Sequence, residues 1–339
     1  MSEFRPELRS LAAGSLPHTD PEAALELALR TLDIPTWPQL PQRAFVENMY
    51  VQFSECFPGV VVEGERIYVD RERDLDRDLE RLYVAYLTDD VDSAAISPQY
   101  AAGLYRFLES DADLSPVVKG QVTGPVSWGL MVVERNRKPI LYDDVLAEAV
   151  GQHLRLKASW MEAQLRTLSS ETIVLVDEPY MSSFGSAFVS LSRGQVVALM
   201  EEVFAGIEGL KGVHCCGNTD WSLLLSTTVD ILSLDAYGYA EELALYHEEV
   251  GAFLERGGSI AWGFVPASDQ ALEETVESLV ERFHAALHLL TEKGLHRDDL
   301  LQSALIMPSC GCGSLSVETA EWVLDLTGKV SNALQARYG

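Results

Sequence analysis

The chain has 339 residues, of which 47% are hydrophobic and 23% are charged, and its net charge is −27. This composition is typical of a globular protein with a well-filled core. The acidic balance argues against binding to nucleic acid or to anionic membranes. No run approaches the roughly 20 apolar residues of a membrane helix. The chain start, residues 1–6, lacks the apolar core of a signal peptide, so a cytoplasmic location is expected.

Eight apolar segments end in polar residues or glycine, which is the pattern of buried strands. They are Ser10–Ser15, Arg43–Met49, Pro116–Gln121, Thr172–Asp177, Gly212–Cys216, Ile231–Asp235, Ser259–Phe264 and Ala304–Pro308. Helical periodicity fills most gaps, as in Val145–Leu168, Gly194–Ile207, Tyr239–Arg256, Ala271–Lys293 and Ser316–Leu334. Strands that alternate with helices predict a parallel sheet, and eight of them predict one α/β domain over residues 1–339, a (β/α)8 or TIM barrel.

Three other segments have patterns of their own. Val60–Val69 has a Glu-Gly turn between two β-branched runs and predicts a β-hairpin inserted after the second strand. Arg71–Arg81 is rich in charge and is expected to be a solvated helix face. Glu134–Pro139 is a basic island in an acidic chain.

Polar residues gather where the predicted strands end. They are Ser15, Glu47, Asp177, Glu178, His214, Cys216, Asp235 and Cys310. In a (β/α)8 barrel the active site lies at the carboxyl ends of the strands. The eight residues are therefore expected to face one site.

Two clusters of soft ligands predict a metal centre. His214 and Cys216 are two residues apart, so in extended backbone their side chains point the same way, while Cys215 points to the other face. Cys310 closes the set, and Cys312 is its competitor. Imidazole with thiolates is a preferred zinc set, and an open fourth position makes such a zinc catalytic. Five cysteines in this grouping fit reduced thiols better than disulfides.

Two acidic strand ends flank this centre. Asp235 is either a fourth zinc ligand, a hydrogen-bond partner of His214, or ordinary strand-end polarity. Asp177 and Glu178 are an anionic pair that either binds a substrate ammonium group or complements a helix dipole. A zinc with thiolate ligands favours activation of a substrate thiol over ionisation of water for hydrolysis.

These residues resemble a known family. The chain looks like the catalytic C-terminal barrel of cobalamin-independent methionine synthase, and is similar to the methylcobamide:thiol methyltransferases of the uroporphyrinogen decarboxylase superfamily. The matching motifs are Ala13–Pro17, Met49 with Pro58–Gly59, Thr123–Pro125, Val176–Pro179, His214-x-Cys216 followed by Gly217–Thr219, and Pro308–Gly311.

The resemblance implies roles for individual residues. His214, Cys216 and Cys310 would be the catalytic zinc ligands, with Asp235 where the synthase has a longer glutamate ligand. Homocysteine would be bound by Ser15, Glu47, Met49 and Asp177. The synthase's histidine on the seventh strand has no counterpart in 261–266, and its N-terminal half, which helps bind the folate tail, is also missing.

The expected function is therefore zinc-dependent methylation of homocysteine to methionine. The expected donor is methylcobalamin, free or on a corrinoid protein, because a methyl–cobalt donor leaves without a proton and needs no acid-base histidine. Glu134–Pro139 is a candidate corrinoid contact. Three alternatives stay open: transfer to another thiol such as coenzyme M, methyl-folate as the donor, and a non-catalytic protein that binds zinc or a corrinoid.

Overall fold

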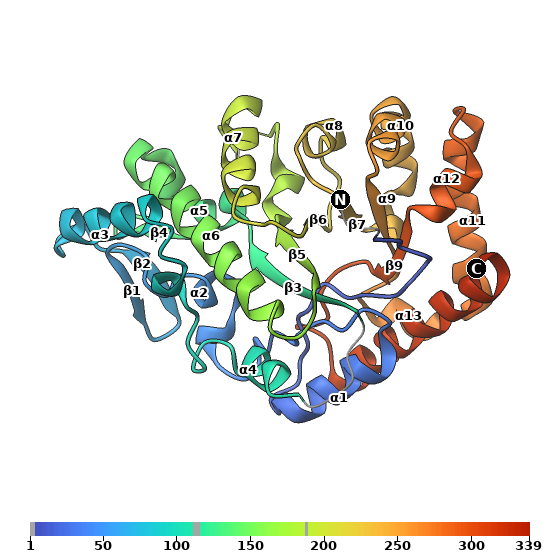
Figure 1. Cartoon of the computed structure of the whole chain (residues 1–339), viewed down its shortest axis with the longest axis horizontal. Coiled ribbons are helices and arrows are strands. Elements are labelled where there is room, and N and C mark those ends of the chain that lie inside the picture. The colour runs from blue at the N-terminus through green and yellow to red at the C-terminus, as the bar shows by residue number, and fades with distance from the viewer. Residues whose placement is uncertain (1–3, 111–115, 187–188) are drawn as a thin grey trace.

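A computed structural model describes residues 4–110, 116–186 and 189–339. Its larger sheet has six parallel strands in the order β3 (Val117–Thr123), β5 (Glu171–Asp177), β6 (Leu210–Cys215), β7 (Ile231–Leu234), β8 (Ser259–Val265) and β9 (Ala304–Pro308). The sheet curls, and the helices lie around its outside (Figure 1). The α/β class and the parallel sheet are thus confirmed, and the last six predicted strands are present within two residues of their expected bounds.

The helices alternate with the strands along most of the chain. They are α1 (Pro21–Thr31), α2 (Met49–Gln52), α3 (Leu75–Leu87), α4 (Ala102–Leu108), α5 (Pro125–Met131), α6 (Asp144–Leu165), α7 (Arg193–Phe204), α8 (Trp221–Leu225), α9 (Ala236–Leu243), α10 (His247–Glu255), α11 (Val276–Glu292), α12 (Arg297–Gln302) and α13 (Val317–Tyr338). The single helix predicted over Tyr239–Arg256 is two, α9 and α10, joined by a short 3-10 turn. No helix in the described part of the chain is long and apolar enough to span a membrane.

The predicted hairpin is present as part of a second, small sheet. Strands β1 (Val60–Glu63) and β2 (Arg66–Val69) pair antiparallel, and β4 (Val133–Glu134) runs parallel to β2. Gly64 occupies the turn with a φ of 58°, a conformation that glycine adopts at little cost.

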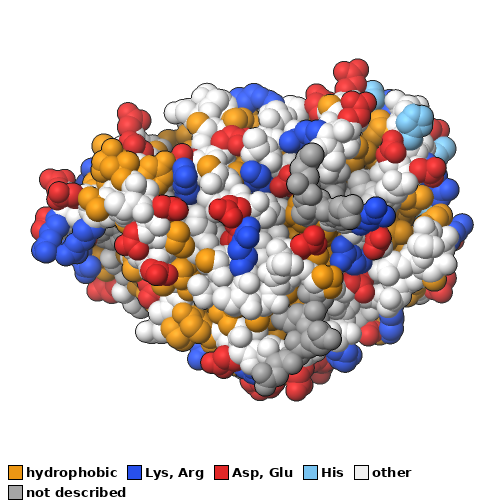
Figure 2. Space-filling view, in the orientation of Figure 1, with side chains coloured by type: hydrophobic (Ala, Val, Ile, Leu, Met, Phe, Trp, Pro, Cys, Tyr) orange, Lys and Arg blue, Asp and Glu red, His pale blue; other side chains and the backbone are white. Residues whose placement is uncertain are grey.

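Figure 2 shows that the acidic side chains are spread over the face of the molecule turned to the viewer instead of gathered in one patch.

The first two predicted strands are not regular strands. The segment 8–11 lies beside β9, where the Leu8 amide donates to the Ala304 carbonyl at 3.0 Å, but it makes only an isolated bridge. The strand predicted over Arg43–Met49 is wrong, because residues 45–47 form a 3-10 turn and the Asn48 side chain caps α2. Beside β3 lies instead the segment 34–39, through a bridge between Thr36 and Lys119.

Proline explains why that neighbour of β3 is hard to recognise. Pro35 and Pro38 lie within the segment and Pro41 follows it. A proline has no N–H to donate to a sheet ladder, so the segment bonds to β3 at single positions only. Pro35 still accepts from the Lys119 amide at 2.8 Å, and the Ile34 amide donates to the Ser10 carbonyl at 2.9 Å.

The curled sheet separates two apolar cores. The larger core lies between the sheet and its helices. The smaller one lies inside the curl and combines side chains from opposite edges: Leu11, Ala13, Ile34, Val117, Ile173, Ile231, Ala261, Leu305 and Met307. Toward the carboxyl ends of the same strands, the inward positions become polar.

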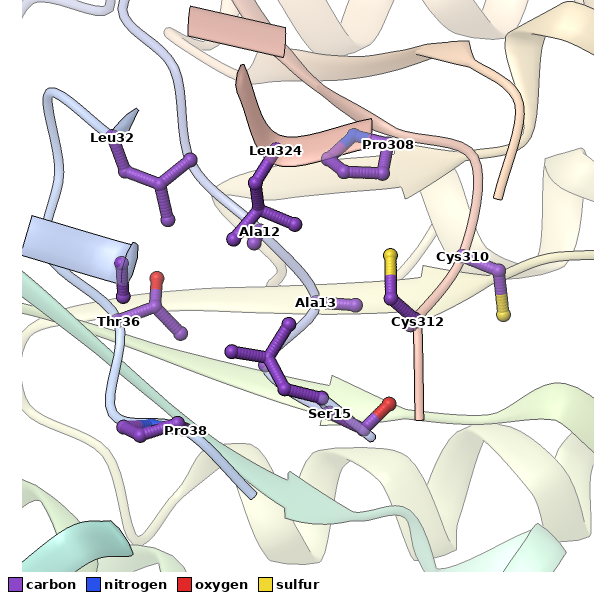
Figure 3. A pocket seen from close by; sticks show the side chains of 14 residues that line it. Ala12, Ala13, Ser15, Leu32, Thr36, Pro38, Pro308, Cys310, Cys312 and Leu324 are labelled. Carbon is purple, nitrogen blue, oxygen red and sulfur yellow. The ribbon is translucent and has the colours of Figure 1, made fainter. Parts of the chain in front are cut away.

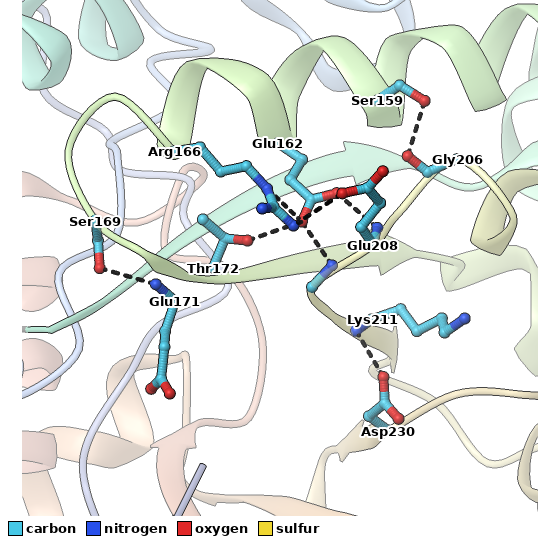
Figure 4. A network of polar contacts seen from close by, with 11 residues as sticks. Ser159, Glu162, Arg166, Ser169, Glu171, Thr172, Gly206, Glu208, Lys211 and Asp230 are labelled. Carbon is cyan, nitrogen blue, oxygen red and sulfur yellow. Dashed lines mark hydrogen bonds and ion pairs between the residues drawn. The ribbon is translucent and has the colours of Figure 1, made fainter. Parts of the chain in front are cut away.

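One buried carboxylate ties the opposite, amino ends of β5 and β6 to helix α6. Glu162 of α6 accepts hydrogen bonds from the Glu208 and Gly209 amides at 2.7 and 2.6 Å, and from the Thr172 hydroxyl at 2.9 Å (Figure 4). The Arg166 guanidinium pairs with the same carboxylate at 3.0 Å. The chain therefore uses one acid to satisfy the loop before β6.

Replacement of Glu162 by alanine would leave these donors without a partner. We expect Glu162→Ala to lower the free energy of unfolding by about 2–4 kcal/mol, since buried unpaired donors cost that much. Urea denaturation followed by circular dichroism measures the change. Glu208→Ala is the control: this side chain is 84% exposed and also pairs with Arg166, so a change within about 0.5 kcal/mol is expected. Equal losses in both variants would contradict the assignment.

Candidate metal and substrate site

Three predicted ligands come together at the carboxyl ends of the strands. One ring nitrogen of His214 and the sulfur atoms of Cys216 and Cys310 all lie within 4.8 Å of one another. His214 is in β6, Cys216 directly follows that strand, and Cys310 is two residues beyond β9. His214 is buried and the two cysteines are half-buried. The sequence therefore identified the only such group of His, Cys, Asp or Glu found among the described residues.

Ser233 fixes the orientation of the His214 ring. His214 Nδ1 and Ser233 Oγ are hydrogen-bonded at 2.8 Å, and Ser233 Oγ donates to Met307 Sδ at 2.8 Å. Because the hydroxyl hydrogen is used toward sulfur, the oxygen accepts from Nδ1–H. The buried Nε2 then has a free lone pair and no hydrogen-bond partner. A buried nitrogen of this kind beside two thiols fits a metal ion, and Ser233 is the outer partner that such a ligand needs.

Of the two thiols, Cys216 loses its proton easily and Cys310 retains its own. Hydrogen bonding to Cys310, helped by His214, lowers the pKa of Cys216 to about 4. The pKa of Cys310 is raised, first by its hydrogen bond to Cys216 and then by burial. One thiolate is therefore stable at neutral pH, while the second needs an additional positive charge. A divalent cation supplies that charge, so the donor set fits zinc.

The other two cysteines of the clusters point away from this group. Cys215 is fully buried in the core between sheet and helices, and burial raises its pKa to about 12. Cys312 is buried in the same core, with a pKa likewise raised to about 12 by burial. Figure 3 shows the Cys310 and Cys312 side chains pointing to different sides of their loop. The strand-phase argument for Cys215 and the choice of Cys310 over Cys312 agree with these positions.

Asp177 lies next to the three ligands and opposite a buried lysine. It ends β5 and pairs in register with His214 of β6. Its Oδ1 is buried without a hydrogen-bond partner. Burial raises the pKa of Asp177 to about 6, although the Lys119 and His214 charges lower it. Burial likewise lowers the pKa of Lys119 to about 7, against the effect of Asp177. The sequence analysis did not identify Lys119, because a lysine in a strand gives no signal of burial.

Glu178 does not share the position of Asp177. Its carboxylate accepts from the Val126 and Ser127 amides at 2.8 and 2.7 Å, and from the Ser127 hydroxyl at 2.5 Å. It thereby caps the amino end of α5. Gly124 is needed here, because a Cβ would lie 2.3 Å from the carboxyl group. These contacts favour the interpretation of Glu178 as a partner of a helix end over its interpretation as a substrate-binding residue.

Ser15 lies against the loop that carries Cys310. The Ser15 carbonyl accepts from the Cys312 amide at 2.9 Å, and its hydroxyl lies so close to Gly311 that a Cβ there would be 2.1 Å away. A cavity of about 10 Å³ lies between residues 12–16 and this loop (Figure 3). Such a volume admits about one water molecule, so the cavity is a packing gap and not the substrate site.

Glu47 ends the 3-10 turn before α2, and Met49 is the first residue of that helix. The buried Glu47 carboxylate pairs with Arg43 at 2.5 Å and is hydrogen-bonded to the Ala102 backbone. Burial raises the pKa of Glu47. The Met49 carbonyl accepts from the Thr123 hydroxyl at 2.8 Å, which ties the turn to the carboxyl end of β3. Met49 is thus next to the strand ends, whereas the described contacts of Glu47 are with Arg43 and α4.

Asp235 faces the metal group without joining it. Its side chain caps α9 by accepting from the Gly238 amide at 2.8 Å. Burial raises the pKa of Asp235. Among the smaller effects, the Cys216 charge raises this pKa and the His214 charge lowers it. The interpretation of Asp235 as the partner of His214 is not supported, because Ser233 holds that position.

Tyr50 is a further residue that the sequence analysis missed. Burial raises its pKa, and the charges of Tyr180, Glu178, Cys216 and Asp177 add to that rise. Its phenol therefore lies near the metal group. No spacing marks it in the sequence, since the Asn48 cap that places it occurs in many turns.

This geometry belongs to a fold seen in methyltransferases. A B12-independent methionine synthase from Shewanella sp. W3-18-1, solved in complex with selenomethionine, has a TM-score of 0.62 at 18% identity, over 97% of this chain and 98% of that one. A methyltransferase from Methanosarcina mazei has a TM-score of 0.54 at 14% identity, over 95% of this chain and 87% of that one. No family model and no curated protein matches the sequence.

The expected resemblance is confirmed at the level of the fold. The chain shares the fold of these methyltransferases. The match spans almost all of both chains, so an N-terminal half, on which part of the donor expectation rested, does not distinguish the two chains.

The basic loop before α6 is less available to a ligand than its composition indicates. Arg135 pairs with Asp70 at 2.7 Å and with Glu72 at 3.7 Å, and its guanidinium lies over the Tyr68 ring. These contacts tie the loop to the small sheet and to the segment that follows β2. The charge of Arg135 is therefore used within the chain.

The ligand set predicts how cysteine variants differ in metal content. We expect Cys216→Ser and Cys310→Ser to lose most bound zinc, because each removes one of three ligands, while Cys215→Ser keeps about one zinc per chain. Metal analysis of the purified variants measures this. Cys312→Ser is a second control, since its thiol lies in the core. Loss of zinc from Cys215→Ser with retention in Cys216→Ser would contradict the ligand assignment.

Proposed function

We propose that this chain is a zinc-dependent methyltransferase that converts homocysteine to methionine. The observation that carries the proposal is the buried group of His214, Cys216 and Cys310 beside Asp177, in a fold shared with a methionine synthase. His214, Cys216 and Cys310 would hold the ion. When bound, zinc would lower the pKa of the acceptor thiol and hold it as thiolate at neutral pH.

We also propose that the fold is a complete eight-membered barrel. Its first two members would be the extended segments 8–11 and 34–39, which are hydrogen-bonded to β9 and β3 and linked to each other through Ser10 and Ile34. The single inner core, which combines residues of both segments with those of the sheet, supports this closure. A closed barrel excludes water from the inner side of the site.

The chain's own side chains would place the acceptor. The Asp177 carboxylate has a free oxygen and suits an ammonium group, and the Ser15 hydroxyl lies beside the Cys310 loop, where it suits a carboxylate. The Shewanella enzyme was solved with selenomethionine, an analogue of the proposed product. In-line attack on a methyl donor then needs alignment more than proton transfer.

For the donor, we propose methylcobalamin or a methylated corrinoid protein. The support is the carboxyl end of β8, where Val265, Pro266 and Ala267 offer no side chain that donates a proton. A methyl–cobalt donor leaves without a proton, whereas an amine leaving group needs one. The Shewanella enzyme is described as B12-independent, which favours a donor other than a corrinoid.

The donor assay compares two methyl sources side by side. We expect methionine to form from homocysteine with methylcobalamin or a methylated corrinoid protein, and not with methyl-folate carrying short or long glutamate tails. Product is measured by mass spectrometry, with zinc-depleted protein as the control. Efficient turnover with methyl-folate in the absence of a corrinoid would reject the donor and leave the homocysteine assignment standing.

The acceptor assignment makes a separate prediction. Asp177→Asn keeps the size of the side chain and removes the charge that would bind the ammonium group. We expect the KM for homocysteine to rise by a factor that corresponds to about 2–4 kcal/mol. Zinc content should stay unchanged. If the variant and the wild type convert homocysteine with the same KM, Asp177 is not part of the acceptor site.

A further inference from the structure

Lys119 is a fully buried cation inside the curled sheet, close to the proposed acceptor site. It lies on β3 with no exposed surface. An ammonium group that loses its water costs several kcal/mol unless charge and hydrogen bonds compensate. No carboxylate lies within ion-pair distance of it among the described residues, and the nearest opposite charge that acts on it is Asp177. Its compensation must therefore come from its hydrogen bonds and from the charge of the site.

Its hydrogen bonds lead to the turn that carries Ser15. The Lys119 ammonium donates to the Ala13 carbonyl and, at 3.0 Å, to the Gln121 side-chain oxygen. The Gln121 amide packs so closely on Gly14 that a Cβ there would be 2.4 Å away, and Gly14 has a φ of 126°. Lys119 and Gln121 together therefore hold the backbone on the amino side of Ser15.

The charge balance of the site also requires a cation here. In the proposed centre, two thiolates neutralise a divalent ion, and Asp177 adds one negative charge. Homocysteine as a thiolate brings two negative groups and one positive group, so the loaded site has an excess of negative charge in a barrel interior with little water. Lys119 acts on Asp177, and its hydrogen bond to the Ala13 carbonyl places its ammonium group against the Ala13–Ser15 turn. A carboxylate bound at that turn should gain most from this charge, because Asp177 already pairs with the ammonium group of the acceptor.

We propose that Lys119 is a positioning residue that selects acceptors carrying a carboxylate, because it fixes the Ala13–Ser15 turn and supplies positive charge behind it. The inference rests on the proposed function and deepens it by naming the feature of the thiol that is recognised. Asp177 would recognise the ammonium group, and the turn held by Lys119 would recognise the carboxylate. The two residues should therefore respond to different parts of the acceptor.

The test compares three thiols on zinc-loaded protein by titration calorimetry. L-homocysteine has both groups, 4-mercaptobutyrate lacks the amine, and 3-aminopropanethiol lacks the carboxylate. At a pH well above the pKa of Asp177, where this carboxylate stays ionised in both proteins, we expect Lys119→Met to weaken binding of homocysteine and 4-mercaptobutyrate roughly 10- to 100-fold and to leave 3-aminopropanethiol nearly unchanged. Asp177→Asn should show the reverse selectivity between the two truncated thiols. Zinc content should match the wild type in both variants.

Two further variants separate this role from a general loss of packing. Lys157→Met is the matched control, because Lys157 of α6 is also fully buried but donates to the carbonyl of Ala95, which follows the 3-10 turn Val91–Ala94, away from the metal group. It should lower the melting temperature without changing the order of the three thiols. Lys119→Gln keeps a hydrogen-bond donor for the turn and removes the charge, so it provides a folded variant if the methionine variant unfolds. It should also weaken binding of both carboxylate-bearing thiols.

The outcomes distinguish the inference from the function on which it rests. An equal loss of affinity for all three thiols in Lys119→Met and Lys119→Gln would overturn the inference while the homocysteine assignment stands. Wild-type protein that contains zinc and binds none of the three thiols would overturn the proposed function, and the inference with it. A loss confined to thiols with a carboxylate would support both.

Discussion

The parallel register between β5, β6 and β7 is the constraint on which the site depends. It pairs Asp177 with His214 and His214 with Ser233, so that an acid, a metal ligand and the partner of that ligand lie in one row across three strands. A shift of one residue in any pairing would turn the side chains of that strand to the other face. Apolar residues at neighbouring positions of these strands hold the register, because they pack into the cores on both sides of the sheet. The backbone pairing thus fixes the positions of Asp177, His214 and Ser233 relative to one another.

Hydrogen bonds from residues around the three ligands and Asp177 fix the orientation of the functional side chains. Ser233 leaves one nitrogen of His214 free, Glu178 anchors α5 next to Asp177, and Ser15 supports the loop of Cys310. Each of these contacts joins parts of the chain that belong to or adjoin different strands. A metal ion placed among His214, Cys216 and Cys310 would therefore meet ligands that already share one small volume, so little ordering entropy would be lost on binding.

The elements and site residues that depend on local sequence patterns could be predicted. The six strands of the larger sheet are rich in apolar residues, and the i, i+2 spacing of His214 and Cys216 depends only on strand periodicity, so both were predictable. The segment 34–39 was not, because Pro35 and Pro38 remove the donors that give a strand its pattern. Arg43–Met49 contains a short apolar run, Ala44–Val46, like that of a buried strand, but Asn48 caps a helix there. Lys119 and Tyr50 acquire their environments from elements far away in the chain, which no local pattern records.

The contact between Ser15 and Gly311 has a consequence for how the protein is made. It joins the start of the chain to a loop almost 300 residues later, and Cys310 is on that loop. During synthesis Cys310 leaves the ribosome only after every strand of the sheet has been translated, so the proposed metal centre would be completed only when β9 has joined the sheet. Long-range closure of this kind is slow compared with the packing of adjacent helices. Until it occurs, His214 and Cys216 alone offer an incomplete site, and a metal captured early would be held loosely enough to leave.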